Sequence, residues 1–85
     1  MKPRAVLARL LAGTVTNVTF SDAQKLLVAL GFDELRIKGS HHVYGRPGLA
    51  EQLNLQDRGG QAKPHQLRQL VDLVRRYDLS IEEDE

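Results

Sequence analysis

Hydrophobic residues recur at helical spacing in three segments of this 85-residue chain. The first segment begins near Pro3. The second begins with Ser21 and Gln24, which form a capping-box pattern, and ends at Gly31. The third follows Pro64, and charged and polar residues occupy the side opposite its apolar stripe. The stripes consist of Val6, Leu7, Leu10 and Leu11; of Leu26, Leu27 and Leu30; and of Leu67, Leu70, Val71 and Val74. The spacing predicts three amphipathic helices.

Between the second and third predicted helices, three short segments alternate apolar and polar residues. They cover residues 35–38, 42–44 and 52–56, and each has one apolar face and one polar face. Consecutive antiparallel strands with helices before and after them are typical of an α+β sandwich. We therefore expect a three-stranded antiparallel sheet with the helices on one face and solvent on the other, plus an extra N-terminal helix.

Two adjacent histidines, His41 and His42, fall at the turn between the first two predicted strands. A two-residue loop of Gly39 and Ser40 would mix charged and apolar side chains on each sheet face. A three-residue loop that also includes His41 would separate them. Three-residue loops usually have glycine last, whereas here it comes first. The alternation nevertheless predicts the three-residue loop.

This register predicts that His42 lies on the open sheet face while His41 lies in the turn. The neighbours expected around His42 are Lys38, Arg36 and Tyr44. An imidazole titrates near neutral pH, so it can exchange a proton with a ribose 2′-hydroxyl, and basic side chains beside it can bind the phosphate. Structural or surface histidines are commoner than catalytic ones, so the pair alone does not decide between these roles. A metal site is not expected, because adjacent strand residues point to opposite faces and His65 has no partner at a suitable spacing.

Composition excludes several other kinds of site. The chain has no cysteine, so disulfides and thiolate metal sites are ruled out, and a reducing cytoplasm is the expected compartment. Arg4 and Arg9 interrupt the apolar run near the N-terminus, so we expect this run to be neither a signal peptide nor a membrane span. A single small domain has no cavity between domains, so any active site is expected on a surface or in a shallow groove.

Basic residues are concentrated in the body of the chain. Residues 1–77 contain all 12 Lys and Arg and 6 of the 11 Asp and Glu, a balance of +6, and residues 78–85 carry the other five acids. A basic body favours an anionic partner such as a phosphate backbone, although a solvated charged surface has the same composition.

Two stretches, LLVALGFDELRIKGSHHVY and LNLQDRGGQAKPHQLRQLVDLVRRYDL, resemble the HicA (YcfA-like) toxin family. In that family a helix ending in glycine and an aromatic residue leads to a basic strand, a Gly-Ser-His/Asn-His element, two more strands and a helix. The resemblance covers about two thirds of the chain and implies three parts. These are an N-terminal helical extension and linker (1–20), a HicA-like domain (21–79) and an acidic tail expected to be disordered (80–85).

The resemblance implies a fold like the double-stranded RNA-binding domain. It also implies the toxin of a type II toxin–antitoxin pair, a ribosome-independent mRNA interferase neutralised by a HicB antitoxin. The family's catalytic histidine is the second residue after Gly-Ser, which is His42 here. Many members have His-Pro after the second strand, where this chain has Arg46-Pro47. A second acid–base group would then have to be His41, His65 or water.

On this reading no metal or other cofactor takes part. His42 activates the 2′-hydroxyl, Lys38 and Arg36 hold the phosphate, and a cyclic phosphate results. Further RNA contacts are expected from Ser40, Tyr44 and Lys63, each with a simpler alternative: a turn residue, a cross-strand filler and an ordinary loop lysine. The competing interpretation is a non-catalytic RNA-binding module of the same fold.

Overall fold

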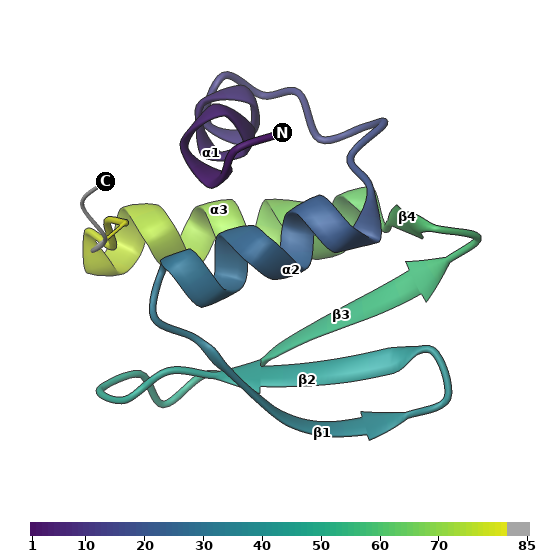
Figure 1. Cartoon of the computed structure of the whole chain (residues 1–85). Helices are drawn as coiled ribbons and strands as arrows, with labels where there is room; N and C mark the ends of the chain where they lie inside the picture. The colour runs from purple at the N-terminus through teal and green to yellow at the C-terminus, as the bar shows by residue number, and fades with distance from the viewer. Residues whose placement is uncertain (82–85) are drawn as a thin grey trace.

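Three helices and a four-stranded antiparallel sheet make up the computed structural model, which describes residues 1–81. The order is α1 (Pro3–Leu11), α2 (Phe20–Ala29), β1 (Asp33–Lys38), β2 (His41–Gly45), β3 (Leu53–Arg58), β4 (Gln61–Ala62) and α3 (Pro64–Tyr77). Helices α2 and α3 lie over one face of the sheet, where both contact β3, and α1 lies across them on the side away from the sheet and contacts both (Figure 1). The expected α+β fold with an antiparallel sheet is confirmed, with the short strand β4 as an unpredicted addition.

The start of α2 differs from the prediction. The N-cap is Thr19 rather than Ser21, and the Thr19 hydroxyl accepts a hydrogen bond from the backbone N–H of Asp22 at 3.1 Å. A threonine followed three residues later by an acid is an equally good N-terminal signal, and the acid in the first turn suits the helix dipole. At the other end the prediction holds. Gly31 has a φ of +94°, and buried Phe32 donates its N–H back into the helix.

The N-terminal segment packs into the same hydrophobic core as the rest of the chain. Val6 and Leu10 of α1 are each 1% exposed, and Val15 and Val18 of the following segment are also buried. Other members of the core come from α2 (Leu26, Leu27, Leu30), the sheet (Tyr44, Leu53, Leu55) and α3 (Leu67, Leu70, Leu73). Residues 1–20 are therefore structurally continuous with residues 21–79. Of the expected acidic tail, residues 82–85 lie outside the described residues.

Strand β4 pairs with both β3 and the segment that precedes α2. Gly59 and Gly60 form the two-residue loop between β3 and β4, with φ of +60° and +86°. A hairpin turn of this kind requires positive φ at both positions, and glycine adopts positive φ without strain. The N–H of Phe20 donates to the Gly60 carbonyl and that of Ala62 to the Val18 carbonyl, both at 2.9 Å. The start of α2 is thereby fixed to the end of the sheet. Among the described residues, no helix is long and apolar enough to cross a membrane.

The predicted three-residue loop between β1 and β2 is wrong, because Gly39 and Ser40 alone form the loop. The observed partners are Lys38–His41, Ile37–His42, Arg36–Val43 and Glu34–Tyr44, with a bulge between Glu34 and Arg36. The prediction assumed that the apolar residues of β1 face the core. Instead Leu35 and Ile37 are 49% and 57% exposed, and Tyr44 is buried at 2%. Leu35 lies on the open face, and Ile37 lies at the edge of the sheet where no helix of the described chain packs on it, so both side chains stay in solvent.

Candidate functional site at the β1–β2 hairpin

His42 lies on the sheet face that the helices cover, and its expected place on the open face is wrong. It pairs with Ile37 and Leu55 and shares its face with Tyr44 two residues later. The His42 side chain is 16% exposed, and its ring is tilted against Phe20, the first residue of α2, with 4.7 Å between centroids. The imidazole therefore lies between helix and sheet, with a small part of the side chain still exposed to solvent.

A carboxylate holds the His42 ring. The Nδ1 atom of His42 is paired with Oε2 of Glu34, which reaches across from β1. Because the carboxylate occupies Nδ1, Nε2 is the ring nitrogen that remains for another partner. Sequence reasoning missed Glu34. In the observed register His42 pairs with Ile37, and Glu34 reaches the face of His42 only because the bulge after it shifts the parity of the strand.

Tyr44 lies beneath α2 beside the same pair of residues. Its hydroxyl accepts a hydrogen bond from Nε2 of Gln24 at 3.0 Å. Burial raises the pKa of Tyr44, and the negative charge of Glu34 raises it further. The phenol therefore stays neutral across the physiological range. At 2% exposure the ring has no face on which a base could stack, so the RNA contact expected of Tyr44 is not retained.

The open face of the sheet carries His41 together with two basic side chains. Directly paired strand residues share a face, so Lys38, His41 and Gln56 form one row across three strands, and Arg36, Val43 and Asn54 form the next. Arg36 also donates to the side chain of Gln52 at 3.3 Å. The expected basic neighbours of a hairpin histidine are therefore present, but they surround His41 and not His42.

The remaining predicted residues lie at the ends of elements. Ser40 is in the hairpin loop, and its carbonyl accepts the N–H of Asp57 at 2.9 Å, which suits a turn residue. Lys63 is the N-cap residue of α3 without a side-chain capping bond, and His65 is exposed in the first turn of that helix. Within residues 1–81 no group of three or more His, Cys, Asp or Glu side chains could hold a metal ion.

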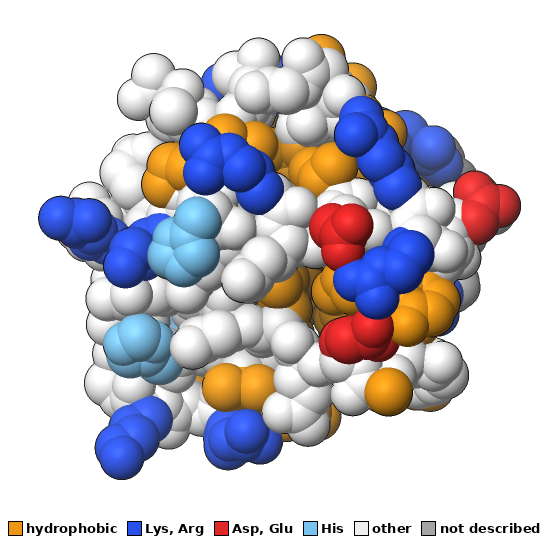
Figure 2. Space-filling model, turned by 180° about the vertical axis from the view of Figure 1, so that it is seen from behind, with side chains coloured by type: hydrophobic (Ala, Val, Ile, Leu, Met, Phe, Trp, Pro, Cys, Tyr) orange, Lys and Arg blue, Asp and Glu red, His pale blue; other side chains and the backbone are white. Residues whose placement is uncertain are grey.

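Charge divides one face of the molecule into two halves. Seen from behind, histidine side chains lie among Lys and Arg on one half, whereas Asp and Glu lie among Lys and Arg on the other (Figure 2). Positive charge without neighbouring acids is suited to a polyanion. The histidine-bearing half is therefore the better candidate for contact with a phosphate backbone.

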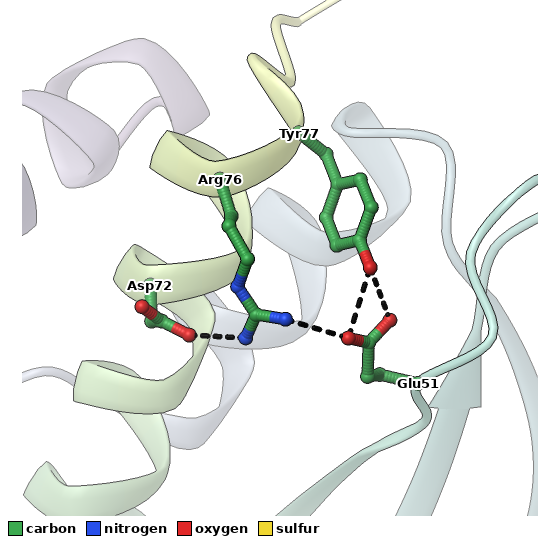
Figure 3. A network of polar contacts seen from close by, with 4 residues as sticks. All are labelled: Glu51, Asp72, Arg76 and Tyr77. Atoms are coloured by element: carbon green, nitrogen blue, oxygen red, sulfur yellow. Dashed lines mark hydrogen bonds and ion pairs between the residues drawn. The ribbon is translucent and has the colours of Figure 1, made fainter.

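A separate polar network fixes the end of α3 to the loop before β3. Arg76 binds Glu51 at 2.7 Å and also pairs with Asp72, and the Tyr77 hydroxyl donates to both oxygens of Glu51 (Figure 3). The Tyr77 hydrogen bond and the Arg76 charge lower the pKa of Glu51, while the same carboxylate raises the pKa of Tyr77. Both carboxylates of this network, Glu51 and Asp72, are paired with hydrogen-bond donors, which is typical of a network that holds two segments together.

Comparison of the chain with protein-family models, curated proteins and solved structures gave no match.

Proposed function

We propose that the protein is a metal-independent endoribonuclease that cleaves mRNA with His42 as its catalytic histidine. On this proposal it is the cytoplasmic toxin of a type II pair of the HicA kind, with a fold like the double-stranded RNA-binding domain, and a HicB-type antitoxin neutralises it. The resemblance in the Gly-Ser-His-His element motivates the proposal. The Glu34–His42 pair carries it, because a carboxylate bound to one imidazole nitrogen orients the other for proton transfer.

The proposed reaction is a transesterification. Nε2 of His42 takes the proton of a ribose 2′-hydroxyl, and the 2′-oxygen bonds to the neighbouring phosphorus as the bond to the 5′-oxygen breaks. The leaving 5′-oxygen takes up a proton from water, and the products are a 2′,3′-cyclic phosphate and a 5′-hydroxyl. Glu34 stabilises the imidazolium that forms during the first proton transfer.

RNA binding is assigned mainly to the open face. Arg36 and Lys38 would hold phosphates of the strand beside His41, because this face combines positive charge with solvent access. Since Lys38 and His42 lie on opposite faces, Lys38 is proposed to bind a flanking phosphate and not the scissile one. Ser40 lies at the hairpin tip, where RNA would pass from one face to the other. Lys63 adds a positive charge at the N-terminus of α3.

Expression without antitoxin tests the proposal in cells. Wild type should stop growth and deplete bulk mRNA, while His42→Ala should do neither at equal protein level. His41→Ala is the matched control: its side chain is on the other face, so it should weaken toxicity by reducing RNA affinity without abolishing it. Normal growth with intact mRNA in the wild-type strain would overturn the proposal.

Substrates with a single 2′-deoxy residue at the cut site test the chemistry. Removing the nucleophile should abolish cleavage at that site and leave binding unchanged, and wild-type activity should survive thorough chelation. Continued cleavage of the deoxy substrate, or recovery of a chelated sample only on adding Mg²⁺, would contradict the mechanism.

A passive RNA-binding module is the second candidate, and the basic residues Arg36 and Lys38 on the open face beside His41 favour it. That function predicts RNA affinity that falls steeply with salt and is lost in Lys38→Ala, with no cleavage by any form of the protein. A binding module should therefore be indifferent to Glu34→Gln, whereas the endoribonuclease should lose its rate while keeping its RNA affinity.

A further inference from the structure

Strand β1 is an uncovered edge of the sheet. Within the described residues 1–81 it pairs with β2 alone, and all six of its residues are exposed. Two of them, Leu35 and Ile37, are apolar residues about half exposed to solvent. Edge strands with unpaired backbone groups and apolar side chains can pair with another strand, unless charges or a bulge on the edge oppose the pairing. Because β1 has both charges and a bulge, their arrangement decides which partner strand fits.

The charges of β1 are arranged in opposite signs at its two ends. Asp33 and Glu34 begin the strand, and Arg36 and Lys38 end it. Two identical strands that run antiparallel would therefore place the acidic start of each beside the basic end of the other. Charges that would repel in a parallel arrangement become complementary in an antiparallel one.

The faces of β1 select one register. Asp33, Arg36 and Lys38 lie on the open face, as their partners on β2 show. Leu35 lies on this face too, because its side chain covers Gly45, with Cδ1 2.8 Å from where a Cβ on that glycine would be. The bulge accounts for two successive residues on one side.

Of the six residues of β1, only Glu34 and Ile37 lie on the side of the sheet that the helices cover. A two-fold axis between Leu35 and Arg36 places Asp33 opposite Lys38 of the second copy and Glu34 opposite Ile37 of the second copy, so that each pair shares a face. A shift of this pairing by one residue would place Asp33 of one copy opposite Ile37 of the other, although these two side chains lie on different faces of the sheet.

We propose that two copies of this chain associate through their β1 edges, antiparallel, in this register. The two four-stranded sheets then form one continuous sheet. The exposed Leu35 and Ile37 side chains become partly covered, and two Asp33–Lys38 pairs flank the two-fold axis. The inference does not depend on the proposed ribonuclease activity, because it rests on the exposure, parity and charge of β1 alone.

Charge exchange between two variants tests this register. Asp33→Lys alone would set two lysines against each other in both flanking pairs, and Lys38→Asp alone would set two aspartates against each other there. Each variant should therefore dimerise at least about tenfold more weakly than wild type. In an equimolar mixture every pair is again opposite in charge, and the mixed dimer should recover the wild-type affinity. Both positions are exposed, so folding, checked by circular dichroism, should be unchanged.

The measurement is sedimentation equilibrium of the full chain at low salt, for wild type, each variant and the mixture, up to about 1 mM, which reaches weak association. A wild-type dimer, weakened in both variants and restored in the mixture, supports the proposal. A wild-type protein that stays monomeric, or a dimer that neither variant weakens, overturns it. A dimer weakened in both variants but not restored in the mixture overturns the register.

Discussion

Leu10 of α1 provides a sharp test of whether the N-terminal helix is part of the core. The Leu10 side chain is 1% exposed and packs among the buried residues of the central cluster. Leu10→Ala removes buried methyl and methylene groups and leaves a cavity, at a cost of about 2–5 kcal/mol. A chain of this length has a total stability of roughly 4–13 kcal/mol, so this one change should remove a large part of it.

Leu11→Ala is the matched control in the same helix. The Leu11 side chain is 37% exposed and borders solvent, so its loss leaves no closed cavity and should cost only about 1 kcal/mol. Urea unfolding followed by circular dichroism measures both changes. With a slope of about 1 kcal/mol per molar urea, the midpoint of Leu10→Ala should fall by about 2 M or more. Equal midpoints for the two variants would refute the packing of α1 into the core.

Three further predictions concern the sheet, α3 and the Glu51 network. Gln66→Ala should lower the free energy of unfolding by about 1–3 kcal/mol in urea titration, because the buried Gln66 side chain accepts the N–H of Gln56 at 2.7 Å; no loss would contradict that bond. Asp78→Gly should raise stability by up to about 1 kcal/mol, since Asp78 has a φ of +53° at the end of α3; a loss in thermal unfolding would contradict this. Tyr77→Phe should raise the pKa of Glu51 toward its ordinary value, as measured by NMR titration of the carboxyl carbon. Since that pKa is lower in the folded state, the Glu51 contribution to stability is present above the unfolded pKa and is lost as pH falls through the folded one; an unchanged pKa in the variant would refute the role of Tyr77.

The helices and the order of elements could be predicted from sequence because they depend on local signals. Pro3 and Pro64 begin helices where the apolar spacing starts, and Gly31 ends one. The position of the first helix could not be predicted, because periodicity shows which side of a helix is apolar but not what covers it. Strand β4 was missed because two residues are too few to show alternation.

The hairpin shows why the site was predicted only in part. Alternation predicted His42 beside Lys38 and Arg36 on the open face and His41 in the turn, whereas His41 is the histidine beside Lys38 and His42 lies on the opposite face. A bulge and an exposed edge strand both break the rule that apolar residues of a strand face the core. Tyr44 was taken for a surface residue, whereas its ring fills the core and its hydroxyl is satisfied by Gln24. The misplaced histidines and the misplaced Tyr44 both follow from predicting the pairing of β1 with β2 one residue out of register.

Single-turnover cleavage of RNA by purified protein tests the central claim most directly, because it separates His42 from His41 after RNA binding has been saturated. At saturating enzyme His42→Ala should lose at least about 100-fold in rate, the usual contribution of a general base. Glu34→Gln should lose rate at unchanged RNA affinity, and His41→Ala should keep its rate and bind RNA more weakly. A full rate in His42→Ala, or a loss of rate confined to His41→Ala, would contradict the account.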